Sequence, residues 1–145
     1  MSQHTRQANR ERGSATIEAV IGVPAFLLFV LLIIAAGRLA IARHAVEASA
    51  AEAARSASIS RTQGRAEADG VFGAATSLRN QGVRCTSQRV DIDTSGFAAP
   101  VGTPANVTAT VTCIADLSDI SIPGLPGSRT ITATMSSPID TYRER

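Results

Sequence analysis

A run of 19 residues without a charged side chain, Ala19 to Gly37, constrains this chain more than any other feature. As a helix with ~1.5 Å rise per residue it would be about 28 Å long, close to the thickness of the hydrocarbon core of a bilayer. The rest of the chain has little apolar bulk to surround such a helix, because its aromatic residues are only four Phe and one Tyr. We therefore expect a membrane helix and not the buried helix of a soluble protein.

A secretory signal peptide is the alternative to a retained membrane anchor. The N-terminus carries Arg6, Arg10 and Arg12, and a signal peptidase could cut after Ala42, where Ala40-Ile41-Ala42 fits a small-x-small cleavage site. However, the apolar run is longer than the ~7–15 residues usual for the apolar region of a signal peptide. That length favours the retained anchor.

The orientation follows from cysteine usage more than from charge. Three Arg precede residue 14 and three lie in residues 38–57, so the positive-inside count is nearly tied. Cys85 and Cys113 lie in strand-like sequence, and an even number of cysteines there suits a disulfide in an oxidising compartment. Two unrelated buried thiols are the other reading. We expect a single pass through the cytoplasmic membrane, with the N-terminus cytoplasmic and the C-terminal part outside.

Composition excludes several classes of function. The net charge is +2, from fourteen basic residues, all Arg, and twelve acidic residues, so nothing electrostatic favours nucleic acid as a partner. Two Cys and two His are too few, at unsuitable spacing, for a zinc site. Neither His4 nor His44 has a partner at catalytic spacing. We expect no catalytic residue, no metal and no cofactor, and hence no enzyme.

The sequence predicts that the membrane helix continues beyond the apolar run and that a second helix follows it. Residues 38–60 are rich in Ala and contain neither Gly nor Pro, which predicts one helix from about Ala15 to about Ser58. The small side chains of its second half suit packing against other helices better than a globular core. A second helix is expected from about Arg65 to Arg79, ended by Asn80 and Gly82. Its predicted packed face, at helical spacing, consists of Val71, Ala74, Ala75 and Leu78.

Beyond residue 83 the apolar residues recur at every second position, and no longer at helical spacing. Alternation over Val107–Ala115 and over Ile131–Met135 predicts two half-buried strands, and an earlier strand is expected from about Gln88 to Thr94. The parity of that earlier strand does not continue back to Cys85, so we expect a bulge or a break between them. Cys113 shares the inward parity of Val111. Its pairing with Cys85 would close a loop of about 29 residues, worth roughly 3–4 kcal/mol.

The expected fold class is therefore α+β. A long N-terminal transmembrane helix continues outside the membrane, and a short second helix and a small antiparallel sheet with a disulfide follow. The corresponding regions are a basic leader at 1–13, the transmembrane helix at 14–37, an Ala-rich helical region at 38–82 and a β domain at 83–145.

Glu18 is unusual because it lies at the start of the apolar run. A carboxylate costs roughly 2.5–3.5 kcal/mol at mid-bilayer and less near the interface. Glu18 either snorkels to the interface or has a specific partner. If a peptidase cuts after Gly13, Ser14 gains an α-amino group and Glu18 becomes the fifth residue of the mature chain. That amine could then pair with Glu18 of an adjacent subunit in the membrane.

Residues 12–38, RGSATIEAVIGVPAFLLFVLLIIAAGR, resemble the N-terminal segment of the TadE-like proteins of tight-adherence (Flp, type IVb) pilus systems. The match is carried by Gly13, Glu18, Pro24 and the pair Gly37-Arg38. The resemblance implies a pseudopilin that a membrane-embedded prepilin peptidase cleaves after Gly13. It also implies that the partners are other pilins, pseudopilins and pilus platform proteins, beside membrane lipid.

Two departures from the short Flp pilins indicate a minor or assembly component. Ala19 follows Glu18 where Flp pilins tend to have an aromatic residue, and the chain is far longer than a major Flp pilin. Pro24 removes one helical hydrogen bond and could kink the helix for packing in a filament, or be a neutral membrane proline. The alternative function is a generic membrane-anchored or secreted binding module, cut after Ala42 if the signal-peptide reading holds.

Overall fold

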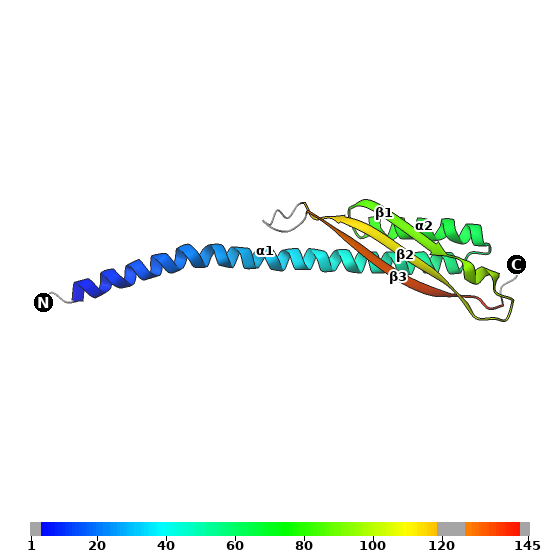
Figure 1. Ribbon diagram of the computed structural model, residues 1–145, viewed down its shortest axis with the longest axis horizontal. Helices are drawn as coiled ribbons and strands as arrows, with labels where there is room; N and C mark the ends of the chain where they lie inside the picture. Colours follow the sequence, from blue (N-terminus) through cyan, green and yellow to red (C-terminus); the bar gives the residue numbers. More distant parts are fainter. Residues whose placement is uncertain (1–3, 119–126, 143–145) are drawn as a thin grey trace. The chain divides into compact units, whose positions relative to one another are not determined.

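The computed structural model describes the backbone of residues 4–118 and 127–142, and the side chains from residue 20 onward within those ranges. The chain separates into two compact units, Met1–Arg38 and Leu39–Arg145. In chain order the elements are α1 (His4–Ser58), α2 (Gln63–Asn80), β1 (Cys85–Asp93), the 3-10 helix η1 (Ser95–Ala98), β2 (Ala105–Asp116) and β3 (Ser128–Ile139) (Figure 1). The expected α+β fold is confirmed.

Helix α1 begins earlier than the sequence predicted, at His4 and not near Ala15. Residues 4–12 are mostly good helix formers such as Arg, Gln, Glu and Ala and contain no Pro or Gly, so the helix extends into the basic leader. Pro24 lies inside α1, and the helix continues through it.

In the C-terminal unit, a three-stranded antiparallel sheet packs on the second half of α1. The core is made mainly of alanine: the buried positions of α1 are Ala42, Ala45, Val46, Ala50, Ala53 and Ala54. They meet the inward side chains of β2 and β3, among them Val111 and Ile131. The expectation that this part of α1 suits packing against other helices better than a globular core is therefore wrong, because its small side chains let the sheet approach the helix closely.

Strand β2 is central and pairs antiparallel with both β1 and β3. The register of β1 against β2 shifts between Cys85 and Ser87, which confirms the predicted bulge or break. On the face of the sheet away from α1, hydroxyl groups pair across β2 and β3 at oxygen–oxygen distances of 2.9–3.1 Å. Those pairs are Thr108–Ser136, Thr110–Thr134 and Thr112–Thr132. Alternation thus gives the sheet one alanine- and valine-rich face and one hydroxyl-rich face.

Helix α2 ends within one residue of the predicted end, and Ala74 and Leu78 are buried as predicted, but the rest of its packed face differs from the prediction. It stops at Asn80, and Gly82 follows with φ of +67°, a conformation that glycine adopts readily. Its buried residues are Ala66, Gly70, Gly73, Ala74 and Leu78, whereas Val71 is 44% exposed. The prediction placed Val71 inward because it counted apolar bulk, and the helix instead turns its glycines toward α1 and β1.

The close approach of α2 explains why glycine is needed on this face. A Cβ atom added to Gly70 would lie 2.9 Å from Ile92 Cδ1 and 3.2 Å from the backbone oxygen of Ala53. One added to Gly73 would lie 2.8 Å from Ser56 Oγ. A larger side chain at either position would push α2 away from its neighbours.

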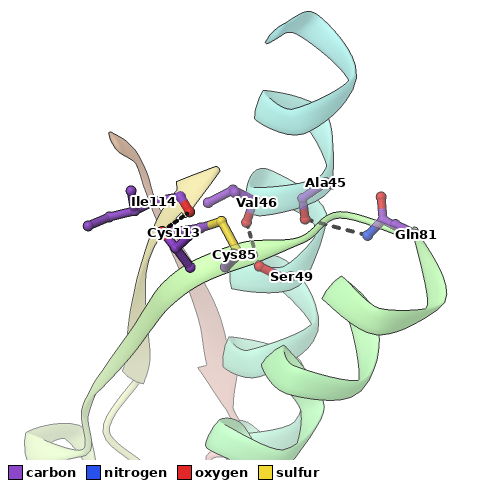
Figure 2. Close-up of a disulfide and its surroundings, with 8 residues drawn as sticks. Ala45, Val46, Ser49, Gln81, Cys85, Cys113 and Ile114 are labelled. Atoms are coloured by element: carbon purple, nitrogen blue, oxygen red, sulfur yellow. Dashed lines mark hydrogen bonds between the residues drawn. A yellow bond between two sulfur atoms is a disulfide. The ribbon is translucent and has the colours of Figure 1, made fainter. Parts of the chain in front are cut away.

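Cys85 and Cys113 form a disulfide, as expected, with Cα atoms 5.4 Å apart. Figure 2 shows it beside Val46 and Ser49 of α1. Cys113 is fully buried, and Ser49 satisfies its own hydroxyl by donating to the carbonyl of Val46 at 2.8 Å. On the other side of this turn of α1, Gln81 Nε2 donates to the carbonyl of Ala45 at 3.4 Å (Figure 2). The disulfide thus fixes the bulged start of β1 to the central strand, under α1.

Candidate membrane anchor and assembly segment

The apolar part of α1 makes no core of its own. Its large side chains from Val20 to Ile34 are mostly more than half exposed, for example Val20 at 68% and Phe26 at 65%. Among the described residues, one helix is long and apolar enough to cross a membrane; it spans Val20–Ser58, and none of its most apolar window is buried. A row of large apolar side chains this exposed needs lipid or other helices around it.

The surface of this segment also contains two open positions. A Cβ atom added to Gly22 or to Gly37 would meet no atom within 4 Å, so both glycines expose backbone on the helix surface. Small residues of this kind let another helix approach closely in a membrane. Pro24 lies between them and lacks an N–H group, so the carbonyl of Val20 loses its usual helical donor. Another chain can therefore approach the anchor closely at both glycines.

The predicted processing and pairing residues lie in the helical part of the chain that precedes the described side chains. Gly13, Ser14 and Glu18 are within α1 by backbone, and their side chains lie outside the described residues. Cleavage after Gly13 and pairing through Glu18 therefore stay predictions. The pair Gly37-Arg38 lies at the end of the N-terminal unit.

Beyond the apolar run, the charged side chains of α1 resume at Arg38. Arg38 and Arg43 are exposed, and His44 Nδ1 lies 3.5 Å from Glu47 Oε2. Further along, Arg55 binds Glu52 with an N–O distance of 3.0 Å, and the hydrogen bond from Arg55 lowers the pKa of Glu52. From Arg38 onward, the face of α1 that is not packed in the core thus carries charged side chains, as expected where a helix leaves a membrane.

Two acidic side chains of β1 bind groups that are close to them in the sequence. Arg89 lies 2.9 Å from Asp91, and its hydrogen bond lowers the pKa of that carboxyl group. Asp93 accepts from the backbone N–H of Ser95, which lowers its pKa as well. In the part of the chain that the structure describes, no three His, Cys, Asp or Glu side chains gather as a metal site would require.

Sequence reasoning missed one surface feature. Ile59 is 73% exposed and Phe72 is 69% exposed, and both line a groove between the end of α1 and the start of α2. The groove has a volume of about 630 Å³, and Arg61, Arg65 and Asp69 line it as well. The only signal in the sequence is Phe72 itself, which lies beside Val71 and between two glycines that belong to the buried face.

The comparison with known proteins gives a match over the N-terminal part of the chain. The family model for TadE-like proteins matches residues 13–55, which include the whole apolar run and most of the helix after it. No curated protein and no solved structure matches the chain. The match covers Gly13, Glu18, Pro24 and the pair Gly37-Arg38, on which the resemblance rested. The resemblance of this chain to the TadE-like family is therefore confirmed, over residues 13–55.

Proposed function

We propose that this chain is a TadE-like minor pseudopilin, a structural or assembly component of a Flp-type pilus or a related secretion system. One observation carries the proposal: the segment that matches the family contains an apolar helix surface with no partner among the described residues. Such a surface is what a subunit needs if its helix is held first by lipid and later by other pilin helices. The proposed role is structural, and the chain is a substrate of an enzyme, not an enzyme.

The proposed chemistry lies at the N-terminal end of α1. A prepilin peptidase hydrolyses the peptide bond between Gly13 and Ser14, which removes the basic leader and leaves an ammonium group on Ser14. That group pairs with the Glu18 carboxylate of an adjacent pilin or pseudopilin. In a low-dielectric membrane an unpaired carboxylate is costly, so the pairing favours assembled over isolated subunits.

The packing of the C-terminal unit supports a retained anchor over a secreted module. Cleavage after Ala42 would remove Leu39 and Ala42 from the core, where Ala42 is only 6% exposed. We propose that the N-terminus is cytoplasmic and that the disulfide-bonded unit is outside the cytoplasmic membrane, where an oxidising environment keeps the bond between Cys85 and Cys113.

Substitution of Glu18 tests the pairing. Glu18→Ala removes the carboxylate, and Glu18→Gln keeps its shape without the charge, so both should insert in the membrane yet be lost from sheared pilus fractions and from cross-linked assemblies. The matched control is Glu47→Gln, on the exposed face of α1 beyond the apolar run, which should assemble normally. Normal assembly of both Glu18 variants would refute the pairing.

A further inference from the structure

Two exposed patches on the C-terminal unit have complementary chemistry. The first, the basic patch, consists of Ile59, Arg61, Arg65 and Phe72, which line one groove. The second, the tail patch, consists of Val101, Asp140 and Tyr142. Val101 is 61% exposed and Tyr142 is 81% exposed. Each patch thus presents two large apolar side chains beside charge. The charges are two guanidinium groups in the basic patch and the Asp140 carboxylate in the tail patch, and Arg143, Glu144 and Arg145 follow Tyr142 in the sequence.

The charges of the basic patch are available for a partner. No acidic side chain among the described residues forms an ion pair with Arg61 or Arg65, whereas two other arginines of this unit do pair, Arg55 and Arg89. Asp69, the one carboxylate in the groove, already accepts a hydrogen bond of 2.7 Å from Ser60. Two guanidinium groups thus stand beside one carboxylate in the groove, and the remaining positive charge favours a ligand that brings an apolar side chain together with a carboxylate.

The tail patch offers that combination. Asp140 and Val101 line one small depression, and the N–H of Gly102 donates to the carbonyl of Thr141 at 2.9 Å, so the loop that carries Val101 is tied to the segment after β3. Asp140 in turn accepts from the backbone N–H of Tyr142 at 3.0 Å. This turn holds one carboxylate beside an exposed aromatic ring.

Both patches lie at the same end of the C-terminal unit. Ser58 at the end of α1 is hydrogen-bonded to Ser137 near the end of β3, with the two hydroxyl oxygens 2.9 Å apart. Figure 1 shows the end of β3 at the same end of this unit as the turn between α1 and α2. The basic patch belongs to the helices, and the tail patch to the sheet and its loop. Two copies that point in the same direction can therefore bring unlike patches together side by side.

We propose that the tail patch of one copy docks on the basic patch of a second copy, with Tyr142 between Ile59 and Phe72 and Asp140 facing Arg61 and Arg65. The contact joins two different surfaces of the same chain, so it leaves one of each free and continues from copy to copy. An open-ended contact of this kind suits a filament or an array. The inference deepens the proposed function and rests on it for the common direction of the copies.

Photo-crosslinking in cells tests the contact. One copy of the full chain carries p-benzoylphenylalanine in place of Tyr142, and a co-expressed second copy carries Ala68→Ser, an exposed position of α2 that marks its peptide by mass. We expect adducts on the peptide of residues 66–79 that bears the mark and carries Phe72, with further adducts on residues 56–61, which carry Ile59. Adducts on the unmarked peptide alone, adducts only outside residues 56–79, or none would overturn the proposal.

Charge reversal separates pairing from mere proximity. The double substitution Arg61→Asp and Arg65→Asp should lower the adduct yield roughly tenfold, because like charges would face each other, and Asp140→Arg should restore it. Arg129→Asp, an exposed position of β3, is the control and should change nothing. An unchanged far-ultraviolet circular dichroism spectrum of each purified variant shows that it has folded.

The mature N-terminus is measured in the same membranes. Chains that begin at Ser14 but give no marked adduct would refute the docking and leave the proposed function standing. Chains that still begin at Met1 would refute the proposed function, and marked adducts from such chains would still support the docking.

Discussion

The glycines of α2 give the sharpest test of how the C-terminal unit is packed. Gly64 and Gly70 are in the same helix, but an added Cβ atom meets nothing within 4 Å at Gly64, whereas at Gly70 it meets Ile92 at 2.9 Å and the backbone of Ala53 at 3.2 Å. Replacing glycine by alanine favours a helix by up to about 1 kcal/mol at either position. Overpacking costs about 1–3 kcal/mol, and it applies to Gly70 alone.

The expected result is a difference in stability between Gly64→Ala and Gly70→Ala. Gly64→Ala should stabilise the unit by up to about 1 kcal/mol. Gly70→Ala should be less stable than Gly64→Ala by about 1–3 kcal/mol, because the shared helix gain cancels. Gly73→Ala should fall between them, because the atom it meets, Ser56 Oγ, belongs to a side chain that can rotate.

Urea unfolding of the full chain in a mild detergent, followed by far-ultraviolet circular dichroism, measures this difference. For a urea slope of about 1–3 kcal/mol/M, the midpoints of Gly64→Ala and Gly70→Ala should differ by about 1 M. Gly64→Leu and Gly70→Leu form a harsher pair that keeps the comparison matched. Equal midpoints for both pairs would refute the close approach of α2 to β1 and α1.

Two further predictions concern the same unit. Replacing Cys85 and Cys113 by Ala should lower its free energy of unfolding by about 3–4 kcal/mol, because the bond closes a loop between residues 28 apart; an unchanged urea midpoint after full reduction of the native protein would contradict this. The pKa values of Asp91 and Asp93 are lowered in the folded state by Arg89 and by Ser95. The stability they add is present above the unfolded-state pKa near 4 and is lost as the pH falls through their folded-state values. Stability should therefore decline below pH 4, and less so in Asp91→Asn; an identical pH profile for that variant would argue against the contribution of the Arg89 pair.

Much of this fold could be predicted because alternation and helix-stop residues act locally. The period-two pattern of Val107 to Ala115 predicted β2, and the broken parity before Gln88 predicted the irregular register near Cys85. Asn80 and Gly82 marked the end of α2 correctly. In each case the residues that carry the signal also form the structure.

The packed face of α2 could not be predicted in the same way. Its contact residues Gly70 and Gly73 are chosen for the absence of a side chain, so a search for apolar bulk passes over them and selects Val71. The start of α1 at His4 was missed for a related reason, because polar helix formers carry no apolar period. At the candidate site, the uncharged run Ala19 to Gly37 predicted the apolar helix. The exposed pair Ile59 and Phe72 depends on a turn between helices that no local pattern describes.

The mass of the mature chain in membranes from cells that possess the prepilin peptidase tests the central claim most directly. A processed, anchored pseudopilin has an N-terminus at Ser14, an intact apolar segment in α1 and a mass two hydrogens lower for the bond between Cys85 and Cys113. We predict that species in the membrane fraction. A chain that starts at Arg43 and is released, or one that retains Met1 in those cells, would contradict the account.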